Sequence, residues 1–78
     1  MGKHVVVYST STCPHCIRVK QFLKENNISF EDIDVTQDHQ QAEIMIEKSG
    51  QMGVPVLDID GDIIVGFDKE KIKTVLGL

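Results

Sequence analysis

Three things are scarce in this 78-residue sequence: long hydrophobic runs, cysteines and positive charge. No apolar run approaches the roughly 18 residues of a membrane-spanning helix. The early stretch Val5 to Tyr8 is also far shorter than the hydrophobic core of a secretory signal peptide, so we expect a cytoplasmic protein. Eight Lys and Arg face twelve Asp and Glu, for a formal net charge of -4. Because nucleic acids and anionic membranes need a basic surface, neither is the expected main partner.

The cysteine count is two, at Cys13 and Cys16. In a reducing compartment such a pair points to redox catalysis or to metal binding rather than to a structural disulfide. A structural staple is disfavoured because closing so short a loop contributes only about 2 kcal/mol, against about 3 kcal/mol for fifteen residues. A zinc site needs four ligands, and no second ligand pair stands at finger spacing, so we expect no metal. Redox chemistry is the favoured reading.

The rest of the chain shows no repeat, linker or low-complexity tract, so we expect one domain over residues 1–78. The apolar pattern predicts strands, helices and turns in the order β-α-β-α-β-β-α. The expected strands are 5–9, 30–35, 54–59 and 63–65, and the expected helices are 14–26, 38–50 and one that starts after Asp68. A right-handed β-α-β crossover and a hairpin around Asp60-Gly61 then predict an α/β fold, with a four-stranded mixed sheet and helices on both faces.

The two cysteines have unequal positions on the first predicted helix. Cys13 stands at its amino end, where unpaired N–H groups and the helix dipole favour a thiolate, and Pro14 is suited to the first helical position. Cys16 lies three residues on, within disulfide reach, and one turn inside the helix. We therefore expect Cys16 to be more buried and less acidic. This arrangement predicts that Cys13 attacks a substrate and that Cys16 resolves the mixed disulfide.

A lowered thiol pKa would help Cys13 chiefly as a leaving group. A thiol with a pKa of about 8.5 is roughly 3% ionised at neutral pH, and one with a pKa of about 6 is about 90% ionised. Falling intrinsic nucleophilicity cancels most of that gain in the attack itself. His15, between the cysteines, would favour the thiolate further and make the protein more oxidising than a bulkier aromatic residue there. The alternative is a solvated helix histidine.

With Tyr8-Ser9, Cys13-Pro14-His15-Cys16, Val54-Pro55 and Gly66-Phe67-Asp68 taken together, the chain resembles the glutaredoxin family over essentially its whole length. The resemblance implies the thioredoxin fold and an enzyme that reduces protein disulfides or glutathione mixed disulfides. It implies Cys13 as the nucleophile and Cys16 as the resolving thiol. It also implies glutathione as a co-substrate rather than a bound cofactor. We expect the protein to be a monomer.

The resemblance assigns six further residues to the substrate or glutathione site, Thr10 and five others. Pro55 would be a cis-proline packed against the active site, where the backbone of Val54 can pair with an extended substrate. The alternative for Pro55 is an ordinary proline at a strand start. Gly66 and Asp68, with Phe67 between them, would present a helix amino end to the γ-glutamyl carboxylate of glutathione, and Asp68 would pair with its amino group.

The sequence departs from the family pattern at positions that bear on the electron donor. Thr10, included in the same substrate site, stands where many members have a Lys that helps hold a glutathione carboxylate. Val65 stands where many have Gly, and the dipeptide Pro-His replaces the common Pro-Tyr. Val65-Gly66-Phe67 is similar to the NrdH-redoxins, hydrogen donors of ribonucleotide reductase that thioredoxin reductase recharges. The donor is therefore glutathione, or a similar thiol, or thioredoxin reductase.

Two other functions that proteins of this fold can have, iron–sulfur cluster binding and non-catalytic interaction, are disfavoured. Some glutaredoxins carry an iron–sulfur cluster bridged between two monomers, but these usually replace the second cysteine and use small residues in the motif. Here Pro14 and Cys16 are present. A non-catalytic interaction module would need no intact cysteine pair.

Overall fold

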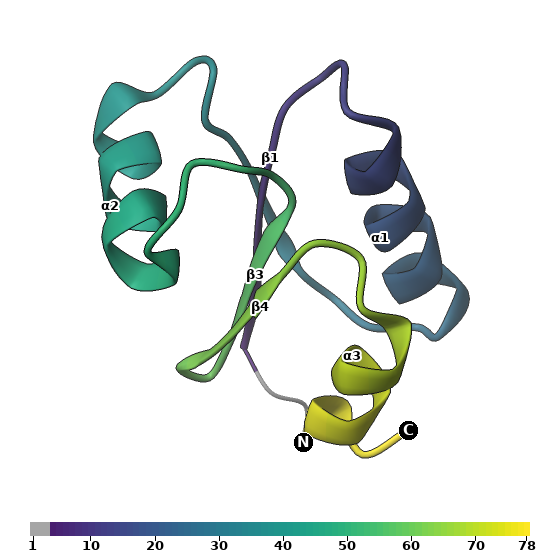
Figure 1. The fold of residues 1–78 in the computed structure, drawn as a ribbon. Coiled ribbons are helices and arrows are strands. Elements are labelled where there is room, and N and C mark those ends of the chain that lie inside the picture. The colour runs from purple at the N-terminus through teal and green to yellow at the C-terminus, as the bar shows by residue number, and fades with distance from the viewer. Residues whose placement is uncertain (1–3) are drawn as a thin grey trace.

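The computed structural model describes residues 4–78, and the first three residues of the expected domain 1–78 lie outside the described range. Figure 1 shows the elements in chain order, which are β1 (Val5–Ser9), α1 (Pro14–Glu25), β2 (Glu31–Asp34), α2 (His39–Ser49), β3 (Val56–Ile59), β4 (Asp62–Val65) and α3 (Lys69–Leu76). The predicted order β-α-β-α-β-β-α is confirmed. No helix within residues 4–78 is long and apolar enough to span a bilayer.

The four strands form one mixed sheet in the order β2-β1-β3-β4. β1 pairs with β2 in parallel and with β3 in antiparallel orientation, and the β3–β4 hairpin is antiparallel. All five residues of β1 are buried, because this strand lies inside the sheet with helices over both of its faces. The predicted topology is confirmed, and it leads the end of β1 directly into the loop before α1.

Two hydrophobic clusters lie on opposite faces of the sheet, as the alternation of side chains along a strand requires. Figure 1 shows α1 and α3 on one face and α2 on the other. The cluster between the sheet and helices α1 and α3 contains Val5, Val7, Val19, Phe22, Leu23, Leu57, Ile59, Ile64 and Ile72. The cluster between the sheet and α2 contains Val6, Tyr8, Met45 and Val56. α1 is thus fixed along the sheet by its buried side, which leaves its first turn free to carry the cysteines.

Three of the predicted strands have shifted boundaries. β2 covers Glu31–Asp34 rather than 30–35, and β3 begins at Val56 rather than at residue 54. Pro55 has no N–H to give to a ladder, so regular pairing begins after it. β4 begins at Asp62, one residue earlier than predicted.

The ends of the elements carry the local signals that the sequence predicts. Asp38 caps α2 by accepting hydrogen bonds from two backbone N–H groups, and Gly50 ends that helix with a φ of 72°. Asp68 caps α3 by accepting the N–H of Lys71. Asp60 and Gly61, between β3 and β4, have φ values of 50° and 95°, as a tight hairpin turn requires.

Candidate active site

The two cysteines lie at the amino end of α1 with their expected difference in burial. Cys13 caps the helix, and its sulfur accepts the backbone N–H of Cys16 at 3.3 Å. Pro14 is the first helical residue, and the carbonyl of Cys13 accepts the N–H of Ile17 at 3.2 Å. Cys13 is partly exposed, whereas Cys16 is fully buried, and both are free thiols. The sulfur of Cys13 is therefore accessible from solvent, and that of Cys16 is buried one helical turn deeper.

The surroundings move the two thiol pKa values in opposite directions. Burial opposes ionisation of Cys13, but hydrogen bonds from Cys16, the backbone N–H of His15 and the charge of Lys20 outweigh it, so the pKa of Cys13 lies below its ordinary value. Burial raises the pKa of Cys16 to about 11, and the neighbouring Cys13 adds to the rise. Cys13 therefore ionises first, and its thiolate is held by donors that a helix end supplies without cost in side-chain entropy.

The loop before β3 forms a wall beside Cys13. The Val54–Pro55 peptide bond is cis, as the resemblance implied, and Pro55 is buried. The Cys13 thiol donates a long hydrogen bond, 3.8 Å, to the carbonyl oxygen of Val54. The Gly66 N–H donates to the carbonyl of Pro55 at 2.8 Å, which joins the segment before α3 to the same wall. Four of the predicted site residues are thus brought together from three parts of the chain.

The remaining predicted residues occupy less direct positions. The backbone of Thr10 forms a hydrogen bond with the Cys16 thiol, which partly offsets the effect of burial on that pKa. His15 is exposed, and its backbone N–H favours the Cys13 thiolate. Phe67 packs toward the core, with its ring centroid 5.9 Å from that of Phe22. Asp68 is exposed while it caps α3, so its carboxylate stands at a helix amino end.

A polar cluster behind the cysteines was not predicted from the sequence. The Lys20 ammonium lies 3.0 Å from Oδ2 of Asp32 and 3.5 Å from Oγ of Ser9, which itself donates to Asp32 at 2.8 Å. The positive charge of Lys20 lowers the pKa of both cysteines. Lys20 follows Cys16 by four residues, and this spacing on one helix face could have revealed it. The strand partner Asp32 had no such signal.

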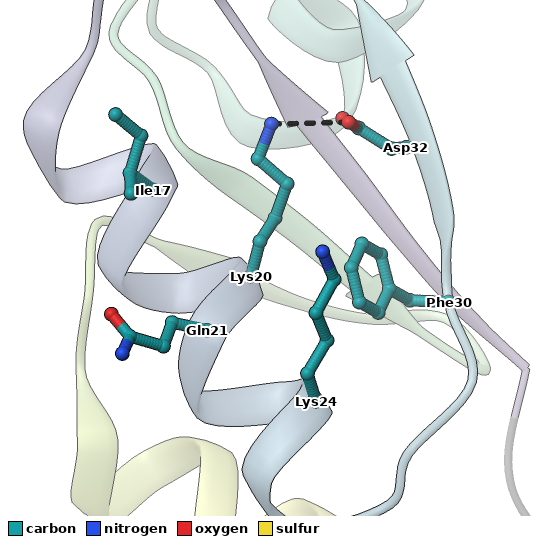
Figure 2. A pocket seen from close by; sticks show the side chains of 6 residues that line it. All are labelled: Ile17, Lys20, Gln21, Lys24, Phe30 and Asp32. Carbon is teal, nitrogen blue, oxygen red and sulfur yellow. Dashed lines mark hydrogen bonds and ion pairs between the residues drawn. The ribbon is translucent and has the colours of Figure 1, made fainter.

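An open groove of about 480 Å³ lies between α1 and the segment around β2 (Figure 2). It is lined by Ile17, Lys20, Gln21, Lys24, Phe30 and Asp32. Residues 4–78 contain no group of three or more His, Cys, Asp and Glu side chains arranged to hold a metal ion.

Comparison with known proteins identifies the family of this chain. The glutaredoxin family model matches residues 5–64. The chain belongs to the glutaredoxin family. A glutaredoxin-like 8.6 kDa protein of the rubredoxin operon of Clostridium pasteurianum is 47% identical over 72 residues, which cover 92% of this chain and 96% of that protein.

Solved structures of glutaredoxins agree with this membership. The glutaredoxin of Archaeoglobus fulgidus superposes with a TM-score of 0.86 at 32% identity, covering 94% of this chain and 85% of that one. A buckwheat glutaredoxin–glutathione complex superposes with a TM-score of 0.77 at 27% identity, covering 92% of this chain and 68% of that one. The chain is therefore a glutaredoxin-like redox protein with a cysteine pair, built on the thioredoxin fold.

Proposed function

We propose that this protein is a dithiol oxidoreductase that reduces protein disulfides and glutathione mixed disulfides. The observation that carries the proposal is the inequality of its two thiols. Cys13 is accessible and has a lowered pKa, and Cys16 is buried one helical turn away with a pKa raised to about 11. A low-pKa thiolate is both available for attack and easily displaced afterwards.

The proposed reaction transfers two electrons to the substrate. The Cys13 thiolate attacks one sulfur of the substrate disulfide, which forms a mixed disulfide and releases the other substrate sulfur as a thiolate. Cys16 then loses its proton to solvent and attacks the Cys13 sulfur. A Cys13–Cys16 disulfide forms and the second substrate sulfur leaves. The substrate thiolates take up protons from water, so the substrate is reduced and the cysteine pair is oxidised.

We propose glutathione, or a similar small thiol, as the reductant of the oxidised protein, working in the cytoplasm. One glutathione opens the Cys13–Cys16 disulfide and a second leaves with the first as glutathione disulfide, which returns both cysteines to thiols. The buckwheat relative crystallised with glutathione supports this choice. The Val54 backbone beside Cys13 and the capped amino end of α3 at Asp68 are suited to a peptide backbone and a carboxylate, respectively.

Two single substitutions test the cysteine chemistry. We expect Cys13→Ser to abolish reduction of both substrate types. We expect Cys16→Ser to lose reduction of protein disulfides and to keep reduction of glutathione mixed disulfides, because that reaction can be completed by free glutathione. The measurement is NADPH consumption in a coupled assay. Full activity of Cys13→Ser would overturn the proposal.

Two observations support thioredoxin reductase as an alternative electron donor. Thr10 offers no charge for a glutathione carboxylate, and Val65 has 48% of its surface exposed where many relatives have Gly. The coupled assay is therefore run once with glutathione and glutathione reductase and once with thioredoxin reductase alone. We expect faster turnover with glutathione. Turnover sustained by thioredoxin reductase alone would replace the donor and leave the roles of the cysteines intact.

A further inference from the structure

The charges of α1 are opposite in sign to those of the whole chain. The protein has a net charge of -4, yet Arg18, Lys20 and Lys24 are on α1 and Glu25 is its one acidic residue. Two of these cations, Lys20 and Lys24, line the groove between α1 and β2 (Figure 2). The groove begins at Ile17, which directly follows Cys16. A basic surface thus adjoins the redox motif of an acidic protein.

The two cations in the groove are not equivalent. Lys20 points to Asp32 across the groove and forms an ion pair with it, so the positive charge of Lys20 is already balanced. Lys24 forms no ion pair with any of residues 4–78. Lys24 and Phe30 both line the groove. The acid in the groove is thus neutralised, and Lys24 remains as a positive charge available to a ligand.

The apolar part of the groove is also exposed. Ile17 has 56% of its surface accessible, and Phe30 is only partly buried. Gln21, which also lines the groove, adds an amide that can bond a peptide backbone. The groove is open to solvent rather than enclosed, so a stretch of chain can reach it from outside. A ligand with a carboxylate next to an apolar side chain would complement the cation and the apolar residues that line the groove.

We propose that this groove binds an acidic segment of a protein substrate while Cys13 reacts with that substrate's disulfide, an inference that rests on the proposed function. The ammonium of Lys24 receives the carboxylate, and Ile17 and Phe30 receive an apolar neighbour. From Cys13 to Lys24 the helix rises about 16 Å. An extended peptide covers that distance in about five residues. The acidic residue of the substrate therefore lies about five residues from its reacting cysteine.

The test uses two synthetic peptides with the same internal disulfide. One carries Glu next to Leu about five residues from the reacting cysteine, and the other carries Gln in place of Glu. Reduced protein is mixed with each peptide, quenched with acid, alkylated and analysed by mass spectrometry to give second-order rate constants. Because an exposed ion pair contributes modestly, we expect the acidic peptide to react about threefold faster. This ratio should shrink at raised salt.

Lys24→Gln is the test variant and Lys73→Gln the matched control. Both remove one positive charge, but Lys73 is exposed on α3, away from the groove. We expect Lys24→Gln to bring the ratio of acidic to neutral rates close to one and Lys73→Gln to keep most of it. Equal loss in both variants, or no preference in the unmodified protein, would overturn the groove's role. Failure of both peptides to react at Cys13 would instead overturn the proposed function itself.

Discussion

At the scale of single residues, one helix end gives two identical side chains different surroundings and therefore different thiol pKa values. Cys13 meets N–H donors and the charge of Lys20, whereas Cys16 meets the protein interior. Both effects act on the same equilibrium, the loss of a thiol proton, and they have opposite signs. Position alone therefore divides the pair into an accessible, more acidic thiol and a buried, less acidic one.

This difference predicts selective alkylation. With iodoacetamide at neutral pH, we expect Cys13 to be modified at least about tenfold faster than Cys16, because only the thiolate reacts. The rate should also rise with pH and level off at a lower pH than for a free cysteine. Peptide mapping by mass spectrometry measures both sites. Equal labelling of the two cysteines in the folded protein would contradict the assignment.

A second prediction concerns Lys20. Replacing it by Gln removes a charge that lowers both thiol pKa values, so the pKa of Cys13 should rise. The alkylation rate of Cys13 below that pKa should fall by about twofold or less, since the charge of a partly exposed ammonium is screened. The same substitution at Lys24, one turn further along α1, is the control. A pH profile unchanged by Lys20→Gln would remove this residue from the site.

At the scale of elements, one ion pair fastens α2 to the sheet. The Lys48 ammonium lies 2.6 Å from Oδ2 of Asp58 in β3 and 3.2 Å from the hydroxyl of Tyr8 in β1. Burial tends to raise the pKa of Asp58, but hydrogen bonds from Lys48 and from the N–H of Gly61, with the charge of Lys48, lower it below its ordinary value of 3.8. The hydrogen bonds to Asp58 and Tyr8 raise the pKa of Lys48.

The Asp58 carboxylate therefore contributes to stability in a defined pH range. Because its pKa is lower in the folded state, the contribution is complete above about pH 4 and is lost as the pH falls further. We expect Asp58→Asn to lower the free energy of unfolding by about 1 kcal/mol at neutral pH and by less in acid. Urea unfolding at neutral pH and near pH 3 measures this. Asp62→Asn, an exposed neighbour in β4, is the control and should change little.

At the scale of the whole molecule, ionisation of the two thiols makes the stability of the reduced protein depend on pH. The lowered pKa of Cys13 stabilises the folded protein at high pH, and this gain is lost as the pH falls through that pKa. The raised pKa of Cys16 has the opposite effect, because the folded state resists its ionisation. Its contribution is intact below about pH 9 and is lost progressively between about pH 9 and the folded value of about 11.

The stability of the reduced protein should therefore decline in alkali for a reason specific to Cys16. From about pH 9 to about pH 10 we expect a loss on the order of 1 kcal/mol, since one pKa unit corresponds to about 1.4 kcal/mol. Urea unfolding in the presence of a reductant measures it. Cys16→Ala should show a smaller decline over this range. A decline of the same size in Cys16→Ala would assign the loss to other groups.

Much of this protein could be predicted from neighbouring residues. Pro14 after Cys13 indicated a helix start, Asp60-Gly61 indicated a hairpin, and the structure confirms both. The role expected for the His15 side chain stays a prediction, and the structure adds a backbone N–H of the same residue that favours the Cys13 thiolate. Lys20 was missed as a group that acts on the thiols, although its spacing from Cys16 on α1 could have revealed it. Its partner Asp32, in β2, had no local signal.

The sequence by itself determined the order of elements and the inequality of Cys13 and Cys16, because both follow from periodicity and position on a single helix. Only the tertiary structure decided what surrounds them. Strand pairing places the Val54 carbonyl at the Cys13 sulfur and joins Gly66 to Pro55, contacts between segments far apart in the chain. The groove beside α1 arises in the same way. Such contacts depend on how whole faces pack, and no local pattern encodes them.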